Sequence, residues 1–232
     1  MAKKLKGKKK KPTHVHIWDI PKRYFPRNTK AKEYAEDLTR ITRGLRYTNQ
    51  RVQYGGQVCS FNIKSINQKS GFVPSPPEAF RVIEEFVYHY ENYCYRLFTY
   101  REKLLQFVNA MLPVGYTEKQ VRIEHILINP IVKQAKLLGL LEKFKKNTSL
   151  SKAIQDRNSL THKLYYGREF DHFFRPKTET EMEKPEQFKK WCDGWKDQIM
   201  SRAALTNTCT RIAFDINNTI ARKIIDYKNS IR

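Results

Sequence analysis

A chain of 232 residues is long enough for one domain with extensions and for a sizeable hydrophobic core. Its 45 Lys and Arg residues outnumber 23 Asp and Glu residues, which gives a formal net charge of +22. Seven lysines lie within residues 3–11, and the charge that remains without them is still about +15. A surplus of this size favours a polyanionic partner, RNA or DNA, over an acidic protein.

The same composition argues against membrane-spanning, secreted and metal-binding classes. No apolar run approaches the roughly 18 residues that a membrane span needs, and the first residues are too charged for a signal peptide. The cysteines stand far apart, with neither paired metal-ligand spacing nor a disulfide framework: Cys59, Cys94, Cys192 and Cys209. We therefore expect a cytoplasmic protein with no metal, no cofactor and no membrane partner.

The chain begins with a lysine-rich tail, residues 1–12, which has no acidic residue and repels itself too strongly to fold alone. Such a tail is typical of a solvated arm that adds non-specific affinity for nucleic acid. Residues 13–75 are expected to form an N-terminal extension. Within it, a cap at Asn28 or Thr29 predicts a helix that runs to about Tyr47.

Two β-rich runs follow, on either side of the pair Gly55 and Gly56. Short runs of this kind about a Gly-Gly pair are typical of a turn, so Arg51–Ile63 is expected to form a small β-hairpin or a basic surface loop. Residues 65–77 hold a glycine and three prolines and are expected to be a linker. The remaining residues, 76–232, are expected to form one helical bundle.

The clearest helix is predicted from Pro77 to Leu112. Apolar residues recur there at three- and four-residue steps, and Pro77 lies where a first-turn proline belongs. Arg101 interrupts the apolar stripe on the side expected to face the core. It is expected to pair with Glu102 or another acid inside the bundle, or else to face a pocket.

Two further helical regions complete the predicted bundle. Thr117 and Gln120 form a capping box for a helix that runs to about Lys146, and Pro130 is expected to kink or divide it. The last helix opens at Pro185 and, with about 45 residues, would span roughly 65 Å. We therefore expect a kink near Gly194 or Thr206–Thr210, or a projection toward a partner chain. Long amphipathic helices with short connections predict an all-α, up-and-down helical bundle.

Between these regions lies the stretch Ser149–Gly167, SLSKAIQDRNSLTHKLYYG, whose ends carry helix-capping residues. Arg157 is followed by the polar Asn158, and His162 comes four intervening residues after Arg157. At 3.6 residues per turn, Asn158 lies near the face of His162, whereas Arg157 is about 140° from His162. A phosphate-binding cation near a proton-transfer group is the pattern of a ribonuclease motif.

A structural role for His162 stays open as an alternative. In a chain with this many arginines, an Arg at a suitable distance before some His occurs by chance, so the bare spacing says little. The polar residue directly after Arg157, and a capped helix late in a helical domain, make the coincidence less common and favour a functional motif.

A helical bundle with R-N-x-x-x-H near the start of a late helix resembles the HEPN superfamily, the nucleotide-binding domains of prokaryotic toxins and defence ribonucleases. The resemblance covers roughly residues 77–232, and its specific part is Arg157, Asn158 and His162. The run YREKLLQFVN, Tyr100–Asn109, is also similar to the second-helix signature of some prokaryotic HEPN families.

The resemblance implies a metal-independent endoribonuclease of toxin–antitoxin or antiviral defence systems, which works as a homodimer with both motifs in one composite cleft. Arg157 would hold the scissile phosphate, and His162 would take or give a proton. Asn158 would orient the imidazole or bind a phosphate oxygen. RNA contacts are expected from four further residues: Lys163, Tyr165, Tyr166 and Arg101.

Two other interpretations of the sequence stay open. One is a nucleic-acid-binding module without catalysis, in which the basic surface and the lysine-rich tail bind the polyanion. The other is an interaction subunit of a larger defence complex. An antitoxin or another regulatory protein is a further expected partner.

Overall fold

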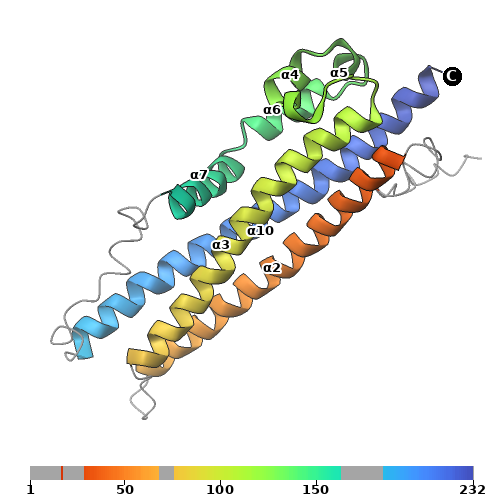
Figure 1. The fold of residues 1–232 in the computed structure, drawn as a ribbon. Helices are drawn as coiled ribbons and strands as arrows, with labels where there is room; N and C mark the ends of the chain where they lie inside the picture. Colours follow the sequence, from red (N-terminus) through yellow and green to blue (C-terminus); the bar gives the residue numbers. More distant parts are fainter. Residues whose placement is uncertain (1–16, 18–28, 68–75, 163–184, 232) are drawn as a thin grey trace, which may run out of the picture.

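The computed structural model of the protein describes residue 17 and residues 29–67, 76–162 and 185–231 (Figure 1). All regular structure in these ranges is helical, and they contain no strand, so the predicted all-α class is confirmed. None of the described helices is long and apolar enough to cross a membrane. Three helices give the molecule its length: α2 (Thr29–Asn67), α3 (Pro76–Met111) and α10 (Pro185–Ser230).

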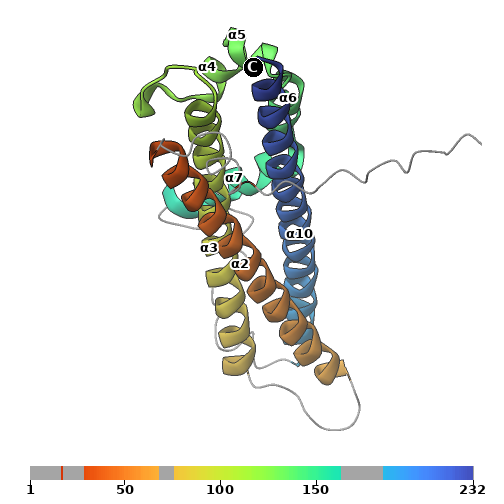
Figure 2. The same cartoon turned by 90° about the vertical axis from the view of Figure 1, so that its right-hand side faces the viewer.

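These helices and the shorter α7 (Thr148–His162) form an up-and-down bundle. α3 and α10 run in one direction, and α2 and α7 run in the opposite direction (Figures 1 and 2). α2 and α7 each pack against both α3 and α10, on opposite sides of that pair (Figure 2). Residues 29–67, expected to lie in an N-terminal extension, therefore share one core with the rest of the bundle.

The chain between α3 and α7 covers one end of the bundle (Figure 1). The predicted capping box is present, with the Thr117 N–H donating to Gln120 Oε1 at 3.1 Å, but it caps only a single 3₁₀ turn. Pro130 divides the expected helix, because its missing N–H falls at the first position of a new one, capped by the Asn129 side chain. The short elements are η1 (Glu118–Gln120), α4 (Ile123–Ile128), α5 (Pro130–Gln134) and α6 (Leu138–Lys145).

The hairpin expected at Arg51–Ile63 is wrong, and so is the alternative of a surface loop, because these residues continue helix α2. Gly55 and Gly56 lie where α2 meets its neighbours. A Cβ at Gly55 would stand 3.6 Å from Phe86 Cα of α3, and a Cβ at Gly56 would stand 3.2 Å from Ile199 Cγ2 of α10. The pair permits close helix packing, and the packing outweighs the low helix propensity of two glycines.

Buried tyrosines of α3 fix its register against α10. Tyr93 donates a hydrogen bond to the backbone carbonyl of Thr206 at 2.8 Å. Seven residues further along α3, Tyr100 donates to the carbonyl of Ala213, which is also seven residues further along α10, and to Asn217 Oδ1, each at 2.8 Å. Burial raises the pKa of both tyrosines above the usual range, so their hydroxyls remain protonated donors.

The last helix runs unbroken from Pro185 to Ser230, a length of 46 residues. Neither Gly194 nor the threonine-rich region of residues 206–210 interrupts it. Buried side chains recur along α10 from Trp191 to Ile225, so most of this helix packs against the rest of the bundle.

Candidate functional site

Helix α7 carries the motif and starts close to its predicted position. Its cap is Asn147 rather than Ser149, since Asn147 Oδ1 accepts a hydrogen bond from the N–H of Leu150 at 3.0 Å. Leu150 and Ala153 then pack into the core of the bundle. One turn later, on the same side of the helix, two residues contact the helices against which α7 packs: Asp156 and Arg157.

Asp156 forms a buried polar contact with both helices on which α7 rests. Its Oδ2 lies 3.2 Å from Arg202 Nε of α10, and these side chains are only 11% and 6% exposed. The Tyr90 hydroxyl of α3 donates a hydrogen bond to the same oxygen. Burial raises the pKa of Tyr90, which keeps this donor protonated. One carboxylate thereby joins α7 to α3 and α10.

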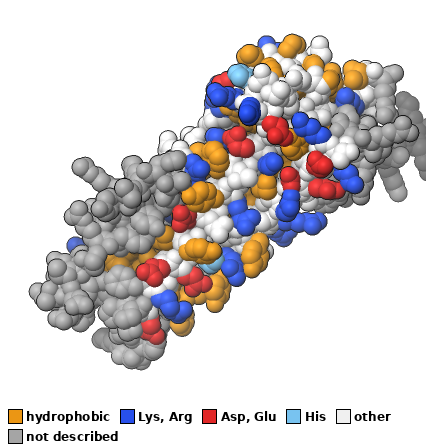
Figure 3. Space-filling model, viewed as in Figure 1, with side chains coloured by type: hydrophobic (Ala, Val, Ile, Leu, Met, Phe, Trp, Pro, Cys, Tyr) orange, Lys and Arg blue, Asp and Glu red, His pale blue; other side chains and the backbone are white. Residues whose placement is uncertain are grey.

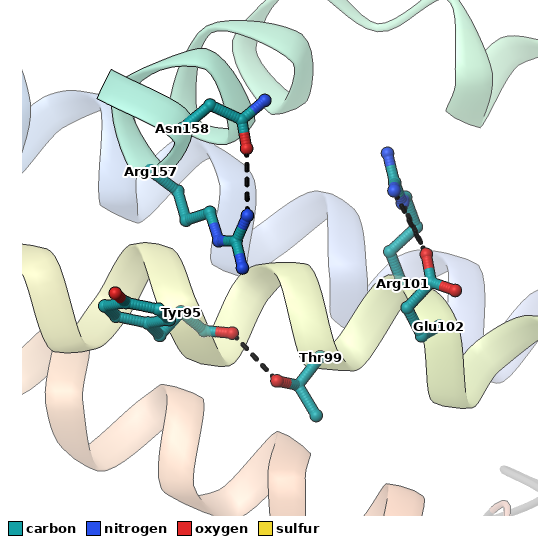
Figure 4. A network of polar contacts seen from close by, with 6 residues as sticks. All are labelled: Tyr95, Thr99, Arg101, Glu102, Arg157 and Asn158. Atoms are coloured by element: carbon teal, nitrogen blue, oxygen red, sulfur yellow. Dashed lines mark hydrogen bonds and ion pairs between the residues drawn. The ribbon is translucent and has the colours of Figure 1, made fainter. Parts of the chain in front are cut away.

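Arg157 is half-buried on the wall that α3 presents to α7 (Figure 4). Its guanidinium lies over two rings of α3, with Cζ 4.4 Å from the centroid of Phe98 and 5.5 Å from that of Tyr95. Its Nη1 donates a hydrogen bond to Asn158 Oδ1 at 3.0 Å. Cation–π contacts and a neighbouring amide thus hold the guanidinium in place while it keeps its charge.

Arg101 shares the Phe98 ring with Arg157. Its Cζ lies 4.9 Å from the ring centroid, and its Nη2 pairs with Glu102 Oε1 at 3.0 Å (Figure 4). Arg101 also lines a pocket of about 230 Å³ between α3, α4, α6 and α7, whose lining includes the buried Phe144 and the exposed Lys145. Arg101 therefore pairs with Glu102 and lines a pocket as expected, but the pair lies on the partly exposed surface, with side chains 33% and 45% exposed, rather than inside the bundle.

The structure places only some of the predicted site residues. Arg157, Asn158 and Arg101 lie together on the α3–α7 face. His162 is the last residue of α7, and its side chain is outside the described residues. Three predicted RNA contacts also lie outside them: Lys163, Tyr165 and Tyr166. Asn158 accepts a hydrogen bond from Arg157, and its expected contact with the His162 imidazole involves a side chain outside the described residues.

Asp156 and Arg202 were not predicted from the sequence, although a signal was present. Asp156 falls on the same side of its helix as Leu150 and Ala153, where an apolar residue is expected. Arg202 interrupts the apolar stripe of the last helix next to Ala203 in the same way. An acid and a base that each break an apolar stripe are candidates for a buried ion pair.

The described residues offer no group of three His, Cys, Asp or Glu side chains that would hold a metal ion. Cys94 and Cys209 are buried thiols in the core. Burial raises the pKa of Cys209 to about 12, so this thiol is protonated and unreactive at neutral pH.

Comparison with protein families matches residues 42–213 to the Cthe2314-like HEPN family. The match covers about three quarters of the chain and includes α3, α7 and most of α2 and α10. The chain belongs to the HEPN superfamily. No curated protein and no solved structure matches it. The match starts inside α2, whereas the resemblance seen in the sequence began at about residue 77. HEPN domains are often ribonucleases, so the match supports a nucleic-acid-related role.

Replacing Asp156 by Ala is expected to lower the free energy of unfolding by about 3 kcal/mol, because it leaves Arg202 buried without this partner. Arg202→Ala should have a similar effect. The double variant should lose clearly less than the two single losses combined, because the two residues act as a pair. Urea unfolding followed by circular dichroism measures all three values.

Asp197→Ala, which removes an exposed acid of α10, serves as the control and should change stability by no more than about 0.5 kcal/mol. Additive losses in the Asp156→Ala, Arg202→Ala double variant would show that the two side chains do not interact in solution.

Proposed function

We propose that the protein is a metal-independent endoribonuclease that cleaves RNA at a composite site in a homodimer. The observation that carries the proposal is the placement of Arg157. A permanently charged guanidinium is held half-buried on Phe98 of α3, five residues before His162 on the same helix. Membership of the HEPN superfamily supports the same activity.

In this mechanism Arg157 binds the scissile phosphate. Its planar guanidinium offers parallel N–H donors to two phosphate oxygens, and its charge stabilises the negative charge that builds up in the transition state. The Phe98 and Tyr95 rings and the Asn158 amide restrict the guanidinium before RNA arrives. Less motion is therefore lost on binding than with a free surface arginine.

His162 supplies proton transfer in the proposal. The RNA 2′-hydroxyl gives its proton to a base as its oxygen bonds to phosphorus. The bond from phosphorus to the 5′-oxygen then breaks, and that oxygen receives a proton from an acid, leaving a 2′,3′-cyclic phosphate and a 5′-hydroxyl. A histidine with an ordinary pKa near 6.5 serves either step at neutral pH.

Helix geometry favours a site shared between two chains. Positions 157 and 162 are about 140° apart around a regular helix, so one α7 is not expected to bring both residues to the same phosphate. Two copies of α7 related by a two-fold axis bring an Arg157 and a His162 from different chains to one cleft, and they also supply one histidine as base and one as acid.

The surroundings of Arg157 provide the remaining RNA contacts in this proposal. Arg101, on the same Phe98 ring, is placed to bind a neighbouring phosphate. Lys163 is proposed to bind another phosphate, and Tyr165 and Tyr166 to stack on bases. An antitoxin or other regulatory protein that covers this face would silence the enzyme.

A series at Arg157 tests the activity. Arg157→Ala should slow cleavage of labelled single-stranded RNA by about 10²–10³-fold, as expected for loss of a group that stabilises transition-state charge. Arg157→Lys should fall between this variant and the wild type, because lysine keeps the charge but not the planar, stacking guanidinium. His162→Ala should cost about 10²–10⁴-fold. Products are separated on denaturing gels in excess EDTA.

Arg211→Ala, which removes an exposed arginine from α10, is the control and should cleave at the wild-type rate. Cleavage that requires Mg²⁺ and leaves 5′-phosphate ends would contradict the mechanism. RNA binding by the wild type with no cleavage of any RNA would favour the alternative of a non-catalytic nucleic-acid-binding module, for which the basic composition is the supporting observation.

Subunit mixing tests the composite site. When wild-type protein is mixed with an excess of His162→Ala protein, heterodimers contain one His162 per pair, and activity should fall faster than the wild-type fraction. The expected deficit is large, since acid and base groups each contribute about 10²–10⁴ in rate. Tagged pull-down confirms that subunits exchange. Activity in simple proportion to the wild-type subunits would mean that each chain holds a complete site.

A further inference from the structure

The outer face of α2 carries a row of arginine and aromatic side chains that the proposed cleavage site does not use. It consists of Arg43, Tyr47, Arg51, Tyr54 and Phe61, and we name it the α2 stripe. At 100° per residue these positions lie within about 80° of one another, on one side of the helix. From its first to its last residue the stripe spans about 27 Å.

The aromatic side chains of the α2 stripe are unusually open to solvent. Tyr47 is 57% exposed, Tyr54 is 62% exposed and Phe61 is 66% exposed. The guanidinium of Arg51 lies over the Tyr47 ring, with Cζ 5.1 Å from the centroid. A row of exposed rings on one helix marks an interaction surface rather than an ordinary solvated face.

The charge of this part of α2 identifies the kind of partner. Between Leu38 and Asn67 the sequence contains four arginines and one lysine, but no Asp or Glu. The surface around α3 is different, because acidic, basic and hydrophobic side chains are mixed there (Figure 3). Exposed rings interleaved with arginines, in a stretch of α2 that has no acid from residue 38 to residue 67, are complementary to a polyanion that has flat apolar groups.

We propose that the α2 stripe binds single-stranded nucleic acid without reading its sequence. The tyrosine and phenylalanine rings stack on bases, and the arginines bind phosphates. At about 3.4 Å per stacked nucleotide, the stripe has room for about eight nucleotides. A second copy of the chain is a poorer occupant, because a two-fold contact between the stripes would bring their arginines together, and α2 supplies no acid between residues 38 and 67 to pair with them.

The α2 stripe is separate from the Arg157 site. α2 and α7 lie on opposite sides of the α3–α10 pair (Figure 2), so the stripe faces away from the site. The proposal therefore does not depend on cleavage, and a binding measurement tests it even if the protein proves to have no nuclease activity.

Fluorescence anisotropy with a labelled 12-nucleotide oligouridine measures the aromatic contribution. Tyr47→Ala and Tyr54→Ala should each raise Kd about fivefold or more and leave its salt dependence unchanged, because stacking neutralises no phosphate. Tyr88→Ala is the matched control. Tyr88 is 61% exposed, and Phe86, two residues earlier, packs against Gly55, so Tyr88 points away from α2 and its loss should not change Kd.

The arginine contribution appears in the salt dependence. Arg43→Ala with Arg51→Ala should lower the slope of log K against log salt by about 1.4, at roughly 0.7 for each phosphate contact on a single strand. Arg211→Ala with Arg222→Ala removes the same charge from exposed positions on α10 and should leave the slope unchanged.

The proposal is overturned if the tyrosine variants bind the oligouridine as the wild type does. It is also overturned if they lose as much affinity for a duplex of equal length, whose paired bases are not available for stacking on the rings. Light scattering tests whether a second copy of the chain occupies the stripe instead. A changed oligomeric state in the stripe variants would overturn the proposal and assign the α2 stripe to a contact between copies of the chain.

Discussion

The position of the motif helix depends on the buried contact between Asp156, Arg202 and Tyr90. α7 is short, and its described apolar face is small, so packing alone defines its position weakly. A buried ion pair adds little net stability over apolar side chains of the same size, but it permits few arrangements, because a shifted carboxylate would leave a buried charge without its partner. The residue that follows Asp156 is Arg157, so the register that satisfies the ion pair also lays the guanidinium on the rings of α3.

Besides its contact with α2, helix α3 presents one face to α10 and another to α7. Tyr93 and Tyr100 donate hydrogen bonds to the backbone of α10, seven residues apart on both helices, and set the register of the long core. Another side of α3 presents Phe98 and Arg101 to α7. Arg157 and its described neighbours thus lie on helices rather than on loops, which is the arrangement that holds a charged group close to one geometry.

The sequence predicted the features that depend on local pattern. The limits of α3, the division at Pro130 and the all-α class follow from apolar periodicity and proline chemistry. Prediction from the sequence failed where the structure depends on contacts between helices. Gly55 and Gly56 resemble a turn locally, but their lack of side chains lets three helices approach one another. Arg157 and Asn158 were predicted from spacing, whereas the Asp156–Arg202 pair requires knowing which helices meet, which no single helix pattern contains.

The most direct test of the account is a double-mutant cycle on RNA cleavage, with single-turnover rates for the wild type, Asp156→Ala, Arg157→Ala and the double variant, at a temperature where all four are folded. If Asp156 acts by holding Arg157 in place, Asp156→Ala should lose most of the rate that Arg157→Ala loses, and the double variant should be no slower than Arg157→Ala alone. Losses that multiply in the double variant, or a wild-type rate in folded Asp156→Ala protein, would contradict it.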